Sequence, residues 1–486
     1  MTQLLPFGFA KRHNVLLELP ATVYTASTLS LSLYSELRRF SNTALKIEKV
    51  GPEKFQKLRA QIYESGSSQT RQAMQGIDTE LELPTLADSM SEAEDLLEQQ
   101  DEAPIIRLIN AILAEAIQSQ ASDIHLETFE KYLSVRFRVD GLLKEVAQPR
   151  RELAVLLISR IKVMAGLDIA EKRIPQDGRL SIKLGGREVD VRVSTLPSIF
   201  GERIVLRLLD KQEQTLDLSA LGMSQPDRQR LQKLLFLSHG ILLVTGPTGS
   251  GKTTTLYAGL SHINDRKQNI LTVEDPVEYH LDGIGQTQVN NKAGMTFAKG
   301  LRAILRQDPD VVMVGEIRDL ETMQVAVQAS LTGHLVLSTL HTNTAAGAVT
   351  RLIDMGIEPF LLSSSLMGVL AQRLVRKLCS GCKQMHRITP IEQEIFGKLQ
   401  PSDTIYRQHP AGCSQCDGQG YRGRTGIYEL ITIDEVLRQL VHDKASQSAL
   451  VNSARPNNPS IREDGLRKIL AGETSIAEVL RVTQKD

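Results

Sequence analysis

The chain has 486 residues, which is too long for one ordinary domain and predicts two to four. Lysine plus arginine equals aspartate plus glutamate at 57 each, so no basic excess indicates binding to nucleic acid or to an anionic membrane. No apolar stretch has the length of a transmembrane helix, and the N-terminus lacks the apolar core and cleavage site of a signal peptide. We therefore expect a protein that stays in the cytoplasm and reaches a membrane only through a partner.

The first part of the chain divides into a folded segment and an acidic run. Residues 1–78 form a mixed α/β segment, with helical periodicity near residues 52–75. Residues 79–102 contain nine acidic side chains and no basic one, which is typical of a solvated linker, although such a run could partly fold on a partner. The sequence thus predicts an N-terminal domain that a linker joins to the rest.

Residues 103–210 are predicted to form a second domain, of the α+β class. It begins with an amphipathic helix at Pro104–Gln118, and alternating apolar residues at Leu133–Val139 indicate a strand. Asp140-Gly141 directly after that strand predicts a hairpin turn. From about residue 215 apolar strands alternate with helical segments, which is the pattern of a parallel sheet.

The segment GPTGSGKT fits the phosphate-binding pattern G-x-x-x-x-G-K-[ST]. An apolar run at 241–244 precedes it and a helical segment at 254–260 follows, as the strand–loop–helix context requires. We expect backbone amides and the helix N-terminus to surround a nucleotide's phosphates, with Lys252 at the β- and γ-phosphates and the Thr253 hydroxyl on Mg²⁺. The predicted nucleotide-binding residues are Gly246, Pro247, Thr248, Gly249, Ser250, Gly251, Lys252 and Thr253.

Two later apolar strands end in carboxylates. The segment ILTVEDPVEY has Glu274 at the end of its strand, and DPDVVMVGEIRD has Glu316. The carboxyl ends of parallel strands meet at the ligand crevice, so both side chains can face the phosphates as a catalytic pair. Gly315 stands where the common Walker B strand has an aspartate, so Glu316 would serve Mg²⁺ through water and help to position the nucleophile. Each could instead be an ordinary strand-end residue, and the general base stays open.

Two histidines lie around the next apolar stretch, in SLTGHLVLSTLHTNTA. His334 and His341 could be structural, or they could sense the γ-phosphate from another strand end. Their spacing favours neither interpretation.

The four cysteines form two C-x-x-C pairs, Cys379 with Cys382 and Cys413 with Cys416. Disulfides are rare in a reducing cytosol, and two such knuckles present four thiolates to a tetrahedral zinc ion. The 30 residues between the pairs exceed the usual ribbon spacing, so we expect a small zinc subdomain at about 376–420. Inert buried thiols or a redox pair are the alternatives. A Cys₄ site leaves no open coordination position, which favours a structural role.

The P-loop, VEDPVE, VVMVGEIRD and TGHLVLSTLHTN together resemble the Walker A, Asp box, Walker B and His box of type II/type IV secretion ATPases. The resemblance runs from about residue 103 to the C-terminus. It implies a RecA-like ATPase domain at 215–486 after a PAS-like α+β domain at 103–210. It also implies a ring, usually a homohexamer, in which ATP lies between the two domains.

The resemblance further implies arginines that close on the phosphates, where they would neutralise charge on the transferred phosphoryl group. The matching positions are Arg192 in VDVRVS, Arg207 in IVLRLLD, and Arg302 and Arg306 in LRAILRQD. Each of the four could instead be an ordinary surface cation.

Within these ATPases, the cysteine insert argues against pilus-retraction motors and DNA-transfer ATPases. LPFGFAKRHNVLLE and the segment from EDLLEQQDE to SDIHLE resemble the general secretion pathway protein E (GspE) family of the type II system. That resemblance implies an ATP-driven motor for pseudopilus assembly. Its N-terminal module would dock on an inner-membrane platform protein, through a GspL-type cytoplasmic domain and with a GspF-type subunit, and acidic phospholipid is an optional contact.

Three other classes of protein remain as alternatives. A type IV pilus-assembly ATPase would share every catalytic motif and differ in the N-terminal module. A nucleic-acid translocase is disfavoured by the neutral charge balance and the lack of an aromatic-basic stretch. A nucleotide-dependent scaffold without catalysis is disfavoured by the intact Lys252, Glu274 and Glu316.

Overall fold

The computed structural model describes residues 104–184, 187–210, 217–400 and 402–483, together with short pieces between residues 13 and 58. The chain divides into two units, Met1–Gln212 and Glu213–Asp486. The predicted acidic linker at 79–102 and most of the helical stretch predicted near 52–75 lie outside the described residues. Within the described ranges, no helix is long and apolar enough to cross a membrane.

The described pieces near the N-terminus form a small three-stranded sheet. Strands β1 (Val15–Glu18) and β2 (Thr22–Thr25) are antiparallel, and β3 (Lys46–Lys49) pairs with β2 in parallel. Its buried cluster consists of Val15, Leu17, Val23, Leu33 and Leu37. Parallel neighbours need a crossover between them, which is consistent with the mixed α/β segment predicted here.

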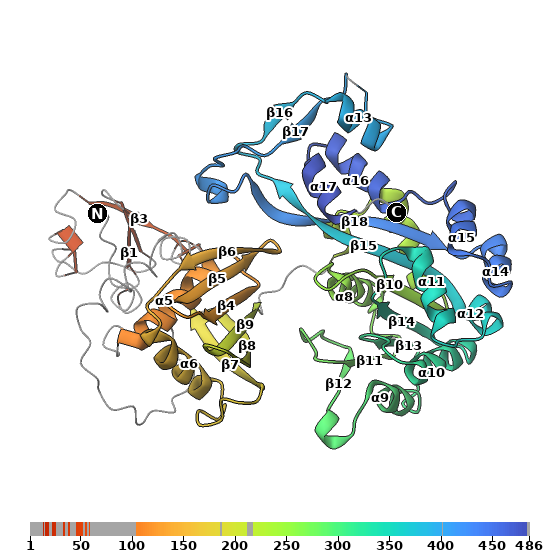
Figure 1. Cartoon of the computed structure of the whole chain (residues 1–486), viewed down its shortest axis with the longest axis horizontal. Coiled ribbons are helices and arrows are strands. Elements are labelled where there is room, and N and C mark those ends of the chain that lie inside the picture. Colours follow the sequence, from red (N-terminus) through yellow and green to blue (C-terminus); the bar gives the residue numbers. More distant parts are fainter. Residues whose placement is uncertain are drawn as a thin grey trace. The chain divides into compact units, whose positions relative to one another are not determined.

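The described residues between 104 and 210 form a six-stranded antiparallel sheet with two helices (Figure 1). Its elements are α5 (Pro104–Gln118), β4 (Asp123–Thr128), β5 (Leu133–Val139), β6 (Leu142–Ala147), α6 (Glu152–Met164), β7 (Gln176–Leu184), β8 (Arg187–Ser198) and β9 (Gly201–Asp210). The strand order is β6-β5-β4-β9-β8-β7. The helix predicted at Pro104–Gln118 and the strand predicted at Leu133–Val139 are both confirmed. The predicted Asp140-Gly141 turn is confirmed as well, because both residues have positive φ and join β5 to β6.

The two faces of this sheet differ in chemistry. Ile124 and Leu126 of β4 join Ile204 and Leu206 of β9 in one apolar cluster with both helices. Alternate residues of a strand point to opposite faces, so the intervening charged residues of these strands share the other face. The helices therefore cover one face, and the opposite face carries carboxylates and arginines.

The second unit is built on a seven-stranded sheet in the order β12-β11-β13-β14-β10-β15-β18 (Figure 1). Its strands are β10 (Gly240–Thr245), β11 (Ile270–Glu274), β12 (Gly285–Gln288), β13 (Val311–Val314), β14 (Leu335–Leu340), β15 (Leu366–Leu378) and β18 (Tyr421–Thr432). All neighbouring strands are parallel except β18, which is antiparallel to β15. The parallel sheet predicted from the alternating pattern is confirmed.

Helices connect these strands and follow them. They are α7 (Gln225–Leu235), α8 (Lys252–Ile263), α9 (Phe297–Ile304), α10 (Leu320–Leu331), α11 (Ala345–Asp354), α12 (Pro359–Ser365), α14 (Glu435–His442), α15 (Gln447–Ala454), α16 (Ile461–Leu470) and α17 (Ile476–Val482). The strand predicted at 241–244 and the helix predicted at 254–260 lie within β10 and α8, as expected.

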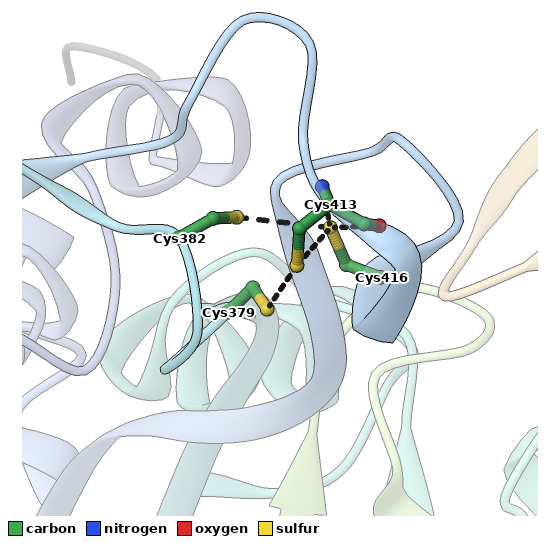
Figure 2. Close-up of side chains that lie close together, drawn as sticks. All are labelled: Cys379, Cys382, Cys413 and Cys416. Atoms are coloured by element: carbon green, nitrogen blue, oxygen red, sulfur yellow. Dashed lines mark hydrogen bonds between the residues drawn. The ribbon is translucent and has the colours of Figure 1, made fainter.

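The segment between β15 and β18 projects from the edge of the sheet (Figure 1). It holds a two-stranded antiparallel ribbon, β16 (Gln384–His386) and β17 (Ile405–Arg407), with helix α13 (Pro390–Phe396) between them. The two cysteine pairs lie at the two ends of this segment and meet in space (Figure 2). The insert is therefore closed at its base by the cysteines.

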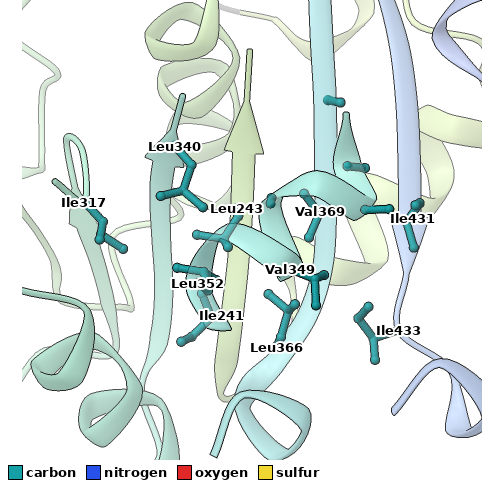
Figure 3. Packing of buried hydrophobic residues seen from close by; sticks show 14 of the residues in the cluster. Ile241, Leu243, Ile317, Leu340, Val349, Leu352, Leu366, Val369, Ile431 and Ile433 are labelled. Carbon is teal, nitrogen blue, oxygen red and sulfur yellow. The ribbon is translucent and has the colours of Figure 1, made fainter. Parts of the chain in front are cut away.

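Both faces of the seven-stranded sheet are covered, as a parallel sheet requires. Along β10, Ile241 and Leu243 belong to one core cluster, whereas Leu242 and Val244 belong to the other. Figure 3 shows the first cluster, where Ile241 and Leu243 lie close to Leu352 of α11. The central strand is thus buried on both sides, and polar groups gather at its carboxyl end.

Candidate active site and metal centre

The P-loop joins the end of β10 to the start of α8. Gly246, Gly249 and Gly251 have φ angles of 153°, 76° and 85°, which L side chains rarely adopt. A Cβ on Gly246 would lie 2.5 Å from the carbonyl oxygen of Gln372, so space is lacking as well. The glycines therefore permit the tight curl that a phosphate cradle needs.

Lys252 is the first residue of α8, and its ammonium folds back over the loop. Nζ donates to the carbonyl oxygens of Gly246 at 2.8 Å and Pro247 at 3.2 Å, and the residue is 9% exposed. Burial lowers the pKa of Lys252 to about 8, while Glu316 opposes this shift and Arg373 reinforces it. The ammonium therefore lies in the loop, where a polyphosphate could replace the two carbonyls as its partner.

We expect nucleotide binding to take up protons near pH 8. Phosphate oxygens beside Lys252 would raise its pKa, so a site that is half deprotonated at pH 8 would gain about half a proton on binding ATP. Affinity for ATP should fall as the pH rises above 8, where Lys252 loses its charge in the free protein. Calorimetry in buffers of different ionisation enthalpy measures the uptake, and Lys252→Arg, which stays charged, is the control. Binding heats of the wild type that are independent of buffer at pH 8 would contradict the expectation.

Glu316 and His341 lie next to Lys252. Glu316 follows β13 and His341 follows β14, and these strands pair in parallel beside β10. His341 Nε2 lies 3.4 Å from Glu316 Oε2, and its Nδ1 lies 3.5 Å from Lys252 Nζ. The structure therefore brings together three of the predicted site residues. Arg318, which the sequence reading missed, also donates to the Glu316 carboxylate.

Gly315 has a packing reason to replace the usual aspartate. Its N–H donates to the carbonyl oxygen of Val273 on β11 at 2.8 Å. A Cβ there would lie 3.3 Å from Cα of Glu274, which is tighter than an ordinary contact. The close approach of the two strand ends therefore favours glycine, and the neighbouring Glu316 is the carboxylate that contacts His341 and Arg318.

Glu274 is held in a separate, buried network. It is 2% exposed, and its carboxylate accepts from Tyr257, from Thr272 Oγ1 at 2.5 Å and from Gln286 Nε2 at 3.2 Å. Burial and the Glu274 charge raise the pKa of Tyr257, which keeps the phenol protonated as a donor. The carboxylate is therefore tied to α8 and β12 in this conformation, so its predicted catalytic role needs a rearrangement of these bonds.

The two histidines occupy opposite ends of β14. His334 precedes the strand, and its Nδ1 lies 2.9 Å from the carbonyl oxygen of Ala329 in α10. Leu335 pairs with Gly240 and Leu340 with Thr245, so only the Leu340 end reaches the P-loop. The six-residue strand separates the ends by about 20 Å. The sequence left γ-phosphate sensing open for both histidines. The position of His334 contradicts that role for this residue, whereas His341 lies beside Lys252 and Glu316.

Arg192 and Arg207 lie on the face of the first unit's sheet that is opposite helices α5 and α6. They are directly opposed in the β8–β9 register. Arg207 Nε donates to Asp123 Oδ1 at 3.1 Å, and its side chain is 52% exposed. Both arginines are on a different unit from the P-loop, and Arg207 is exposed enough to change partners.

Arg302 and Arg306 belong to the second unit but not to the P-loop cluster. Arg302, on α9, donates to Glu321 Oε1 at 2.7 Å, and Arg306 donates to the carbonyl oxygen of Arg302 at 2.8 Å. Both side chains are exposed on this surface. Their catalytic role stays a prediction.

Gln372 and Arg373 on β15 are further functional candidates that the sequence reading missed. Gln372 Nε2 donates to the carbonyl oxygen of Ser250 at 2.6 Å, and its Oε1 accepts from Thr255 at 2.8 Å. Arg373 Nη2 donates to the carbonyl oxygen of Asn343 at 2.8 Å. The sequence could have indicated them, because this polar pair interrupts the apolar run LMGVLAQRLV, and polar side chains in a buried strand need polar partners.

The four cysteines form a compact thiol cluster (Figure 2). All four Sγ atoms lie within 4.8 Å of one another, and the Cys379–Cys413, Cys382–Cys416 and Cys413–Cys416 distances are 3.7, 3.8 and 3.8 Å. Four thiolates at 2.3 Å from a tetrahedral zinc ion lie about 3.8 Å apart, whereas a disulfide requires about 2.05 Å. The spacing therefore fits a metal ion and excludes disulfides.

Backbone amides support the cluster as thiolates. Cys416 Sγ accepts from the N–H of Cys413 at 3.2 Å and of Gly420 at 3.1 Å. Burial alone would raise the pKa of Cys416, but these two amides, together with the neighbouring thiols of Cys382 and Cys413, outweigh it and lower the pKa to about 6. Metal-bound thiolates commonly have such outer-shell donors. The residues present thus fit a closed, structural zinc site.

Comparison with known proteins agrees with this geometry. The profile described as "Type II/IV secretion system protein" matches residues 98–481, and the profile of a domain of "GSPII protein E" matches residues 4–63. The chain is 60% identical to the type II secretion system protein E of Pseudomonas aeruginosa, over 99% of this chain and 96% of that protein. It is 56% identical to the type II secretion system ATPase E of Vibrio cholerae, over 99% of this chain and 97% of that one.

Solved structures with the same fold are more distant. The Legionella pneumophila ATPase DotB has a TM-score of 0.57 at 21% identity and covers 77% of this chain and 94% of its own. The pilus retraction motor PilT, bound to ADP, has a TM-score of 0.53 at 25% identity, over 77% of this chain and 96% of its own. These likenesses confirm the predicted α/β, RecA-like class.

A curled P-loop at the carboxyl end of a RecA-like parallel sheet, with Lys252, Glu316 and His341 in contact, defines a P-loop ATPase. The chain belongs to the type II/IV secretion system protein family and, within it, to the proteins E of the type II secretion system.

Proposed function

We propose that the chain hydrolyses ATP to drive assembly of a periplasmic pseudopilus, which moves folded proteins across the outer membrane. The main support for ATP hydrolysis is that His341 contacts both Lys252 of the P-loop and Glu316. The match of residues 4–63 to a domain of the GSPII protein E favours secretion over pilus assembly.

The proposed roles follow from position. Lys252 would hold the β- and γ-phosphates, and the Thr253 hydroxyl, with Glu316 through water, would ligate Mg²⁺. Mg²⁺ would neutralise phosphate charge. His341 would sense the γ-phosphate, and its contacts with Lys252 and Glu316 support this role. Glu274 would join the site only after leaving its contact with Tyr257.

The surroundings of the motor are proposed from the family. We infer a homohexamer at the inner face of the inner membrane, attached through the N-terminal domain to a GspL-type cytoplasmic domain and coupled to a GspF-type platform subunit. Acidic phospholipid would help this attachment. The ring would bring Arg192 and Arg207, and Arg302 and Arg306 of a neighbouring subunit, to the nucleotide.

We infer that Cys379, Cys382, Cys413 and Cys416 hold one structural Zn²⁺. The support is the 3.7–3.8 Å spacing of sulfurs and the amides that donate to Cys416. The ion would fasten the ends of the insert to the sheet and take no part in hydrolysis, since four thiolates leave no open coordination position.

Hydrolysis should depend on assembly, and this is the test of the proposed motor. We expect low turnover for dilute monomer and a steep rise on forced hexamerisation or with a platform domain and acidic phospholipid, because assembly raises the effective concentration of arginines at each site. Arg207→Ala should flatten that rise and spare ATP binding. Arg173→Ala is the matched control, because Arg173 is an exposed arginine outside the strands that pairs with Glu171. Equal turnover per chain in monomer and hexamer would refute the proposal.

A further inference from the structure

The second unit contains a cavity of about 800 Å³ beside the P-loop. Its walls come from the P-loop at Pro247, the loop after β14, strands β15 and β18, helix α13 with the residues that follow it, and helices α16 and α17. Lys252, Thr253, Glu316 and His341 do not line it. The cavity therefore shares Pro247 with the proposed nucleotide-binding loop, whereas the residues proposed to act on the β- and γ-phosphates lie outside its lining. Its size is that of a small-molecule site.

The lining has a surplus of positive charge. Five basic side chains face two carboxylates, and the basic ones are Arg373, Lys398, Arg455, Arg462 and Arg481. The two carboxylates belong to Glu429, which pairs with Arg455 at 3.1 Å, and Glu463, which pairs with Lys398. Within the cavity the carboxylates cannot balance the cations.

Two of the other cations, Arg481 and Arg462, differ in their partners. Arg481 shares the buried carboxylate of Glu478 with Arg376, at 2.8 and 2.7 Å. Arg462 donates to the carbonyl oxygen of Thr483 at 3.0 Å, and it makes no ion pair with any residue that the structure describes. A guanidinium that has only a carbonyl partner gains most from an arriving anion.

We propose that this cavity binds a small, multiply charged anion of the phosphate class, and that Arg462 is its principal contact. Phosphate matches several guanidinium groups at once, since each oxygen can accept from a separate fork of donors. The same walls also carry apolar side chains that can contact an organic part of the ligand, namely Phe396, Ile461, Leu466 and Val482. A nucleotide or another phosphorylated metabolite has both features.

The cavity is connected to the P-loop through Arg373. Its Nη2 holds Asn343, and its Nη1 would lie 3.2 Å from a Cβ on Gly246, which places the guanidinium against the loop. Thr342, next to Asn343, bonds to Thr245 at the end of β10. An anion that draws Arg373 away from Asn343 would therefore change the loop that holds the nucleotide. This regulatory effect rests on the proposed ATPase activity, whereas the binding does not.

The binding test uses inorganic pyrophosphate and full-length protein whose P-loop is already filled with Mg²⁺ and a non-hydrolysable ATP analogue. Calorimetry should give a dissociation constant of about 1 mM or below. Arg462→Gln should weaken it at least tenfold, and Arg438→Gln, which removes an arginine on α14 that does not line the cavity, should leave it unchanged. If Arg462→Gln melts earlier than the wild type, Lys398→Gln replaces it, because that lysine is 67% exposed.

Three outcomes would overturn the site: no binding, binding that neither variant weakens, or a crosslinked second copy of the chain seated in the cavity. Citrate separates the anion classes, since citrate that binds as tightly as pyrophosphate would overturn the phosphate preference. The regulatory part is tested at saturating ATP and constant free Mg²⁺, where competition in the P-loop vanishes. A change in kcat with pyrophosphate that Arg462→Gln removes supports it, and an unchanged kcat overturns it.

Discussion

Lys252→Ala should abolish ATP hydrolysis. Lys252 Nζ contacts Gly246, Pro247 and His341, and it is the one basic side chain within the eight-residue motif GPTGSGKT. The variant therefore loses the cation that would meet the β- and γ-phosphates. We expect turnover to fall at least about 100-fold, which corresponds to a barrier increase of about 2.7 kcal/mol.

Phosphate release by the assembled protein measures this loss. Lys233→Ala is the matched control, since Lys233 is an exposed lysine on α7 and should keep full turnover. Circular dichroism would show that both variants are folded. Turnover of Lys252→Ala within threefold of the wild type would rule out the P-loop as the site of hydrolysis.

Features that are local in sequence were predictable. The P-loop is eight consecutive residues, and the C-x-x-C pairs fix two ligands each, so their geometry follows from the pattern. The alternation of apolar strands and helices also determined the parallel sheet. In such a sheet the residues that follow neighbouring parallel strands meet at one edge, and Glu316 and His341 do so here.

Features that depend on strand order or direction were not predictable. Gln372 and Arg373 reach the P-loop only because β15 pairs with β10 after a crossover, and periodicity contains no information on that pairing. His334 precedes its strand and His341 follows it. The sequence alone does not show which of these two strand ends lies beside the P-loop, because that depends on how the strand pairs with β10. The contact of Tyr257 with Glu274 could not be predicted for a similar reason, since Tyr257 is on α8 and Glu274 is at the end of β11.

The arginines illustrate a third case, in which the proposed role would come from assembly with other chains. Arg192 and Arg207 face away from the first unit's core, on a sheet surface where Asp123 holds Arg207. A salt bridge of a half-exposed arginine is weak, at about 1 kcal/mol or less, so it can be exchanged for a phosphate. Their proposed role at the nucleotide would therefore depend on assembly, which neither the sequence pattern nor one chain contains.

Loss of the metal should have the other large effect. We expect the purified protein to hold one zinc ion per chain and Cys413→Ser to lose it. The sulfurs of Cys379 and Cys416 lie 3.7 and 3.8 Å from that of Cys413, so removing this thiolate leaves the tetrahedron incomplete. The insert would then keep only its short β16–β17 ribbon and its packing on the second unit.

The metal-free insert should be cleaved rapidly by protease between residues 383 and 412, while nucleotide binding at the P-loop stays within about twofold of the wild type. Elemental analysis measures the zinc, and limited proteolysis measures the opening of the insert. Ser414→Ala is the matched control, because Ser414 lies between two ligands but is itself exposed. If the wild type contains no zinc after metal-replete expression, the four cysteines are inert thiols and the zinc site is refuted. The P-loop follows β10, whereas the insert lies between β15 and β18 of the same sheet. Loss of ATP binding in Cys413→Ser would therefore show that the insert supports the phosphate site.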